Sequence, residues 1–170
     1  MTLLDVFRAH PATYRPLLDY HEAVMRGPSA FTVAERELMA AYVSGLNACG
    51  YCLGVHRVTA ERFGVDRDLL DGLLTDLDHA RGVDDRMRAV LRYVGQLTVA
   101  PAALTRDDAV AVLEAGWGED ALHDAASVCG LFNLMNRIVD GMGVTADDDY
   151  LDISGRRLAE GGYAALKELL

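Results

Sequence analysis

Twenty residues in the first third of the chain, Glu37 to His56, combine reactive side chains with a long run that carries no charge. The stretch reads ELMAAYVSGLNACGYCLGVH, and no Asp, Glu, Lys or Arg lies between its two ends. Such a run approaches the length of a membrane-spanning helix, but Ser44, Asn47 and three glycines interrupt it. We therefore predict a buried helical hairpin.

The rest of the chain is helical in its periodicity, because apolar residues recur at the spacing of one helix face. No β-hairpin signal and no internal repeat is found, so the prediction is a single all-α domain over residues 1–170. In the first half of the chain we predict two short helical pieces within 2–26, divided at Pro11, then a helix over 32–46, a turn at 47–50, a helix that ends at Phe63, and a helix capped by Asp66 with a leucine stripe to Leu77. In the second half we predict helices over 84–100, 105–116 and 119–141, an acidic connector at 146–152 and a last amphipathic segment over 158–169.

Two of these segments have further features. Thr32-x-x-Glu35 is a capping box, in which each side chain satisfies a free backbone donor at the start of a helix. Residues 119–141 are apolar on more than one face, which favours a place inside a bundle or between subunits.

Composition narrows the function classes. Hydrophobic residues make up 51% and charged residues 25% of the chain, as in globular proteins. The formal net charge of −10 argues against nucleic acid and anionic membranes as partners. The first residues show no secretory signal, and three cysteines do not suit a disulfide-stapled secreted fold. We expect a cytoplasmic protein with one reactive cysteine pair.

The spacing of the polar residues in the hairpin indicates a single site. Cys52 and His56 are four residues apart and share a helix face, while Cys49 and Cys52 are close enough to bridge. Glu37 lies on the preceding helix, about nine residues or roughly 14 Å before the turn, so it can reach the depth of His56.

This set of residues predicts thiol chemistry assisted by proton transfer. A buried thiol needs a base, which His56 can supply, and Glu37 can orient and stabilise the protonated ring. The thiolate could attack a peroxide oxygen or a disulfide sulfur, and the second thiol would resolve the product. The helix dipole favours Cys49 as the thiolate, whereas the contact with His56 favours Cys52. We take Cys52 as the attacking thiol and Cys49 as its more accessible partner.

The pattern Glu-x11-Cys-x2-Cys-x3-His, formed by Glu37, Cys49, Cys52 and His56, resembles the signature of the AhpD-like alkylhydroperoxidases of the carboxymuconolactone decarboxylase superfamily. The run MRGPSAFTVAERELMAAYVSGLNACGYCLGVH is similar to its peroxidase-related members, and LFNLMNRIVDGMGV to their C-terminal half. The resemblance covers about residues 20–145 and leaves 146–170 as a C-terminal extension.

The resemblance implies an AhpD-like helical bundle with the cysteine pair at the start of a helix, assembled as trimers or hexamers. It implies a thiol-dependent hydroperoxidase in which peroxide attacks Cys52, Cys49 resolves, and Glu37 and His56 relay protons. A small dithiol or a lipoyl- or thioredoxin-type protein would act as reductant, with no cofactor and no metal. Some members carry a histidine between the cysteines, where this chain has Gly50 and Tyr51.

Other interpretations stay open. Two cysteines and a histidine could bind zinc, although a structural zinc site needs a fourth ligand and no second pair is visible. The cysteines could be small buried core residues, or the chain could be a redox-sensing oligomer. Carboxymuconolactone decarboxylation is allowed by the superfamily but needs no thiol pair. A thioredoxin fold is excluded because no strand precedes the pair.

The remaining candidates are assigned structural roles. Cys129 lies within an apolar segment and is predicted to be core, and Trp117 is predicted to anchor a turn. Asn133 and Arg137 share a helix face and either line the cavity or contact another subunit. The four histidines outside the motif are interpreted as surface or internally satisfied residues: His10, His21, His79 and His123.

Overall fold

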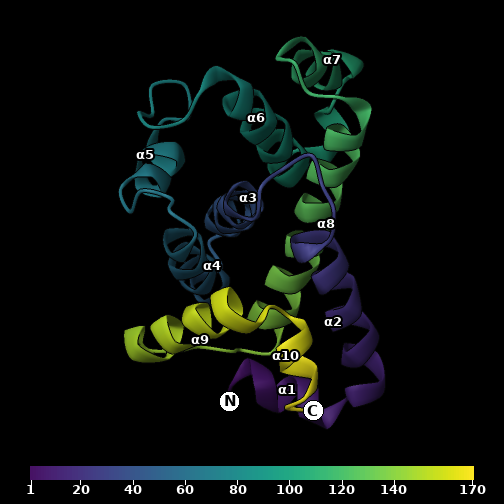
Figure 1. Ribbon diagram of the computed structural model, residues 1–170, viewed down its shortest axis with the longest axis vertical. Helices are drawn as coiled ribbons and strands as arrows, with labels where there is room; N and C mark the ends of the chain where they lie inside the picture. The colour runs from purple at the N-terminus through teal and green to yellow at the C-terminus, as the bar shows by residue number, and fades with distance from the viewer.

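The structure, a computed structural model, describes residues 1–170 and contains helices but no strand, so the all-α prediction is confirmed (Figure 1). The elements in chain order are α1 Leu3–Ala9, α2 Pro11–Arg26, α3 Val33–Leu46, α4 Gly50–Arg62, α5 Leu69–Thr75, α6 Asp85–Val99, a short 3-10 turn Pro101–Ala103, α7 Arg106–Glu114, α8 Glu119–Gly141, α9 Asp148–Gly161 and α10 Ala164–Lys167.

Helix α3 lies at the centre of the molecule, with α4, α5, α6 and α8 packed around it (Figure 1). The predicted capping box closes its start, because Thr32 Oγ1 accepts from the Glu35 amide and Glu35 Oε2 accepts from the Thr32 amide. Every residue from Arg36 to Ser44 is buried. Because α3 is enclosed on all sides, a polar side chain on this helix has no contact with water. Glu37 is such a side chain.

The predicted hairpin turn joins α3 to α4 and sets the position of Cys49. Ala48 has a φ of 55°, in the left-handed region that side chains other than glycine rarely adopt. The following amide of Cys49 donates to the Ser44 carbonyl at 3.0 Å. The chain therefore reverses within a few residues, and Cys49 becomes the N-terminal flanking residue of α4.

Helix α8 matches the predicted segment 119–141 and packs against α2, α3, α4 and α6. Its inward residues include Val128, Cys129, Phe132 and Met135, all fully or almost fully buried. They belong to one core of 37 buried hydrophobic residues. Cys129 is 1% exposed, which confirms its assignment to the core.

The C-terminal extension differs from the prediction. The predicted connector 146–152 is wrong, because α9 begins at Asp148, with Asp147 accepting from the Tyr150 amide at 2.9 Å. The acidic run is the negative first turn of a helix, where it opposes the positive end of the dipole. That helix ends at Gly161, and Gly162 follows as its C-terminal cap.

Helix α9 crosses α4 at close range. A Cβ on Gly155 would lie 2.6 Å from the Val58 side chain and 2.9 Å from the Val55 carbonyl oxygen, so only glycine permits this approach. The two ends of the chain then lie close together (Figure 1), where Arg8 Nε donates to the Leu169 carbonyl at 2.9 Å. The extension thus packs on its own subunit.

The predicted cap at Asp66 is wrong: Asp66 accepts from the Asp68 amide in a preceding turn, and α5 runs only from Leu69 to Thr75. None of the helices is both long enough and apolar enough to cross a membrane.

Candidate active site

Glu37 and His56 form a buried hydrogen-bonded pair between α3 and α4. Glu37 Oε2 lies 2.7 Å from His56 Nδ1, and the two residues are 0% and 6% exposed. A carboxylate only accepts, so Nδ1 carries the hydrogen and Nε2 is the ring atom left to act on another group. The Phe132 ring packs almost perpendicular to the imidazole, with 4.5 Å between the ring centroids, and restricts its orientation.

Arg26 is a third member of this group that the sequence did not reveal. Its Nη1 donates to Glu37 Oε1 at 2.6 Å, and its Nη2 donates to the Leu158 carbonyl at 3.2 Å. Burial alone would raise the pKa of Glu37, but the charges and hydrogen bonds of His56 and Arg26 outweigh it and hold the pKa below its ordinary value. The carboxylate is therefore ionised. The only sequence signal for Arg26 is Glu37 itself, because an ionised carboxylate buried on α3 needs a cation nearby.

The cysteine pair lies at the start of α4, and both of its members are free thiols, as is Cys129 in α8. Cys49 is 0% exposed and Cys52 is 4% exposed, and only Cys52 lines the adjacent cavity. The expectation that Cys49 is the more accessible partner is therefore wrong. As the residue that precedes the helix, Cys49 is turned inward behind Cys52.

The two thiols are not equivalent electrostatically. A hydrogen bond from the Cys52 thiol lowers the pKa of Cys49 despite its burial, and the Cys52 amide adds to this effect. The same thiol–thiol hydrogen bond, together with burial, raises the pKa of Cys52. Of the two thiols, Cys49 therefore loses its proton more readily, as helix-dipole reasoning suggests, whereas only Cys52 lines the cavity.

A buried amide network supports the pair from α8. Asn136 is 1% exposed, and its side chain hydrogen-bonds Cys52, which lowers the pKa of that thiol against the larger effects above. Asn136 Nδ2 also donates to Ser44 Oγ at 3.0 Å, and Asn136 Oδ1 accepts from Asn47 at 2.8 Å. Asn133, predicted as a candidate cavity residue, lies one helical turn before Asn136 on the same helix, so only the fold distinguishes the two asparagines.

Asn133 and Arg137 form the expected local pair, since Arg137 Nη1 donates to Asn133 Oδ1 at 3.0 Å. Neither residue lines the cavity. Asn133 Nδ2 instead donates to Thr98 Oγ1, next to Cys129 in the core. Trp117 is a packing anchor as predicted, because its ring contacts that of Phe31 in a tilted arrangement and its Nε1 donates to the Arg86 carbonyl at 2.9 Å.

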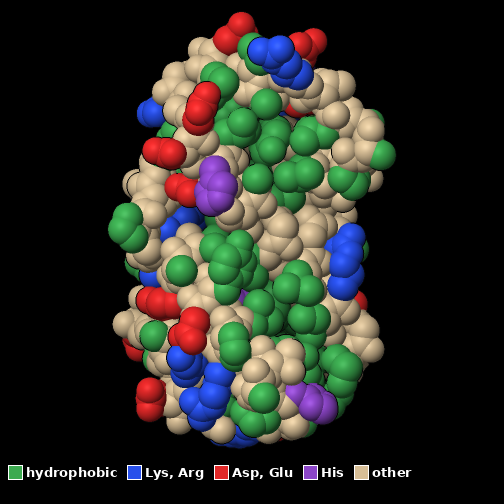
Figure 2. All heavy atoms as spheres, turned by 90° about the vertical axis from the view of Figure 1, so that its right-hand side faces the viewer, with side chains coloured by type: hydrophobic (Ala, Val, Ile, Leu, Met, Phe, Trp, Pro, Cys, Tyr) green, Lys and Arg blue, Asp and Glu red, His purple; other side chains and the backbone are tan.

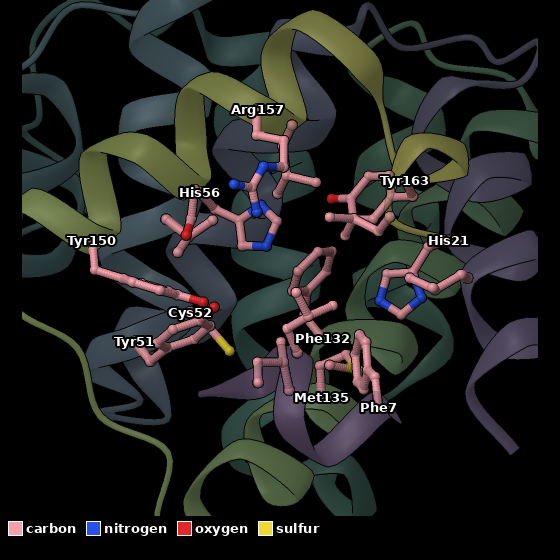
Figure 3. A pocket seen from close by; sticks show the side chains of 17 residues that line it. Phe7, His21, Tyr51, Cys52, His56, Phe132, Met135, Tyr150, Arg157 and Tyr163 are labelled. Atoms are coloured by element: carbon pink, nitrogen blue, oxygen red, sulfur yellow. The ribbon is translucent and has the colours of Figure 1, made fainter. Parts of the chain in front are cut away.

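A cavity opens in front of Cys52 and His56 (Figure 3). Of its 17 lining residues, 13 are hydrophobic, and the four others are His21, His56, Ser154 and Arg157. Six of the 17 come from the C-terminal extension: Tyr150, Ser154, Arg157, Leu158, Tyr163 and Leu166. The segment left outside the family resemblance therefore forms one wall of the site.

Three of the four histidines outside the motif are exposed, but His21 is not. It is 3% exposed and reaches the cavity from α2. Its Nδ1 donates to the Leu17 carbonyl at 2.8 Å, which satisfies one ring nitrogen as predicted but leaves the other free. Neither at this site nor in the rest of the structure are three or more His, Cys, Asp or Glu side chains placed together so that they could hold a metal ion.

Known proteins share this arrangement at the level of family and fold. The model of the carboxymuconolactone decarboxylase family matches residues 11–95. No match was found among curated proteins. A peroxidase-related protein from Silicibacter is 26% identical, with a TM-score of 0.80 over 88% of this chain and 78% of its own.

Two further solved structures show the same fold. A peroxidase-related protein from Ralstonia eutropha, described as an alkylhydroperoxidase AhpD core, is 24% identical, with a TM-score of 0.79 over 89% of this chain and 78% of its own. The debrominase Bmp8, solved as a cysteine-to-alanine variant with 2,3,4-tribromopyrrole, is 14% identical, with a TM-score of 0.73 over 98% of this chain and 81% of its own.

Proposed function

Because the chain belongs to the carboxymuconolactone decarboxylase family and has the AhpD-like fold, we propose that it is a thiol-dependent hydroperoxidase. The proposed catalytic residues are Cys52, Cys49, His56 and Glu37. The observation that carries the proposal is that Cys52 and the His56 ring, which Glu37 holds through Nδ1, line one apolar cavity with Cys49 directly behind.

In the first step, Cys52 attacks the terminal oxygen of a hydroperoxide. The thiol proton passes to His56 Nε2, an S–O bond forms, and the O–O bond breaks with its electron pair on the departing alkoxide. The alkoxide takes the proton from His56 and leaves as the alcohol. Glu37 stabilises the imidazolium in between, since its carboxylate is ionised and already hydrogen-bonded to the ring.

In the second step, Cys49 attacks the sulfenic acid on Cys52. A disulfide forms and water leaves, so the dithiol has lost two electrons and the peroxide has gained them. In the reduced protein the hydrogen bond from the Cys52 thiol lowers the pKa of Cys49. The hydrogen bond from the Cys52 amide lowers it as well and is still present after Cys52 is oxidised, which favours Cys49 as the attacking thiolate. A dithiol reductant must then exchange with the disulfide, and we propose a small dithiol or a lipoyl- or thioredoxin-type protein in that role.

The test is steady-state consumption of cumene hydroperoxide with excess dithiol by the wild type, Cys52→Ser and Cys129→Ser. Cys129 is the matched control, a buried thiol outside the site that hydrogen-bonds Thr98. The proposal expects turnover to be lost in Cys52→Ser and retained in Cys129→Ser. Unchanged consumption in Cys52→Ser would contradict it, and a change of oligomeric state on oxidation without turnover would favour a redox sensor.

We also propose that the protein is a homo-oligomer, a trimer or hexamer. On the face over α2 and α8, hydrophobic side chains gather along the middle (Figure 2). Leu134 and Met142, within and directly after α8, are 47% and 44% exposed. Sedimentation velocity with the wild type and Leu134→Glu tests this: a monomeric wild type would contradict the proposal.

Carboxymuconolactone decarboxylation is the alternative that the family name allows. That reaction has no use for a thiol pair, and the cavity wall is mostly hydrophobic, with Arg157 its only Lys or Arg. No specific feature of the site favours it.

A further inference from the structure

The hydroxyl of Tyr163 is a buried polar atom without a hydrogen-bond partner, and it lies in the wall of the cavity. Tyr163 is 4% exposed. Its oxygen points into the space beside the His56 ring (Figure 3), and the two rings stack with 6.5 Å between their centroids. An unpartnered buried hydroxyl costs stability, so its presence at a reactive site needs a functional explanation.

The fold holds this side chain in place from several directions. Arg26 lies over the ring at 5.1 Å, so the cation that pairs with Glu37 also positions Tyr163. The Tyr163 amide donates to Glu22 Oε2 at 2.7 Å. Just before it, Gly162 has a φ of 63°, and a Cβ there would lie 2.8 Å from the same Glu22 oxygen. The turn is therefore built for glycine, and it delivers the tyrosine into the cavity.

His21 lies next to Tyr163, with 5.0 Å between the ring centroids. Whereas Tyr163 supplies a hydrogen-bond donor, His21 supplies an acceptor. Its Nδ1 donates a hydrogen bond to the Leu17 carbonyl, so in the neutral ring Nε2 carries a lone pair and can accept. Burial lowers the pKa of His21 to about 4, and burial raises that of Tyr163 well above its ordinary value. Both groups are neutral near pH 7: Tyr163 donates and His21 accepts.

We propose that Tyr163 and His21 form a neutral donor–acceptor pair that binds the oxygen of an uncharged organic hydroperoxide and of the alcohol it becomes. The identity of this ligand rests on the proposed hydroperoxidase function. Tyr163 donates to the oxygen that bears the organic group and stabilises the charge on it as the O–O bond breaks. After His56 has returned the proton, the new alcohol O–H donates to His21. Tyr163 keeps its own proton throughout.

The rest of the cavity specifies the organic group. The lining next to the pair is apolar, with Leu18, Phe132 and Leu166 among its residues. A carboxylate at this end would meet the lone pair of His21 and be disfavoured, whereas a neutral hydroxyl group matches both partners. The inferred substrate class is therefore a hydroperoxide of an apolar alkyl or aryl group, such as cumene hydroperoxide.

Binding of an unreactive probe tests the pair without turnover. In a Cys52→Ser background, NMR titration compares cumyl alcohol with tert-butylbenzene, in which a methyl group replaces the hydroxyl. Tyr163→Phe is the test variant, and Tyr93→Phe, a buried tyrosine of α6 that does not line the cavity, is the matched control. One net hydrogen bond corresponds to a preference on the order of 3- to 10-fold.

We expect Tyr163→Phe to reduce the preference for the alcohol by that factor, while Tyr93→Phe leaves it unchanged. Thermal unfolding gives an independent reading, because loss of an unpartnered hydroxyl should not lower the melting temperature of the free protein. An unchanged preference in Tyr163→Phe would overturn the proposal even if the wild type is a peroxidase. Conversely, a wild type that prefers cumyl alcohol over tert-butylbenzene but does not turn over peroxide would contradict the proposed hydroperoxidase function and not the binding pair. Failure of the one proposal is therefore distinguishable from failure of the other.

Discussion

Glu37 accepts the Nδ1 hydrogen of His56 at 2.7 Å, and the carboxylate has no access to solvent. Its second oxygen is held by Arg26, so both oxygens of one carboxylate are engaged by cationic or ionisable partners. A charge buried in this way is stable only with its partners, and it gives the imidazole a fixed tautomer and a fixed orientation. The proposed chemistry of the cysteine pair depends on this arrangement.

Replacing Glu37 with Gln should impair both activity and stability. The amide cannot stabilise an imidazolium, so we expect kcat/KM for peroxide to fall about 100-fold, as for loss of a general acid–base group. Arg26 would lose its ionic partner, and the free energy of unfolding should fall by about 3 kcal/mol. Denaturant unfolding and peroxide assays measure both. Glu114→Gln, an exposed position in α7, is the control, and activity within twofold of wild type in Glu37→Gln would contradict the relay.

His21 should make the fold sensitive to mildly acidic pH. Its pKa is about 4 in the folded protein and 6.5 in the reference state, so the unfolded chain binds the proton first as the pH falls. Stability should therefore be fully present above pH 6.5 and decline toward pH 4, by about 3 kcal/mol at about 1.4 kcal/mol per pH unit. Urea unfolding from pH 7.5 to 4 measures the slope. His21→Leu should remove most of it, and an identical slope in that variant would show that another group is responsible.

Gly155→Ala should loosen the C-terminal wall of the cavity. The new methyl group would meet Val58 and the Val55 carbonyl of α4, so we expect a loss of about 1–3 kcal/mol in stability, as in other overpacked contacts. Gly130→Ala is the matched control, since it lies on an exposed face of α8 with no atom within 4 Å of the added Cβ. That variant should be neutral or stabilised by up to about 1 kcal/mol. Equal effects of the two substitutions would contradict the close contact between α4 and α9.

The part of the site that could be predicted from sequence lies on two consecutive helices. Glu37, Cys49, Cys52 and His56 are linked by a short hairpin, so helix periodicity alone brings Cys52 and His56 together and places Glu37 at a similar depth. The same reasoning located α8 and the capping box of α3, because each has a strong local pattern.

The residues that sequence reasoning missed come from segments that meet only in the folded chain. Arg26 and His21 lie on α2, Asn136 on α8 and Tyr163 after α9, and none has a motif around it. The prediction of a connector at the acidic start of α9 is wrong, because negative charge occurs both in solvated loops and in the first turn of a helix. The relative access of the two thiols depends on how the turn at Ala48 directs Cys49, which no spacing rule encodes.

The most direct test of the central claim is to identify the sulfur that peroxide oxidises first. Wild type, Cys49→Ser and Cys52→Ser are treated with one equivalent of cumene hydroperoxide and then with dimedone, and their peptides are analysed by mass spectrometry. The account predicts a dimedone adduct on Cys52 in Cys49→Ser, and an unlabelled Cys49–Cys52 disulfide in the wild type. An adduct on Cys129, or a Cys49 adduct formed as readily in Cys52→Ser, would contradict it.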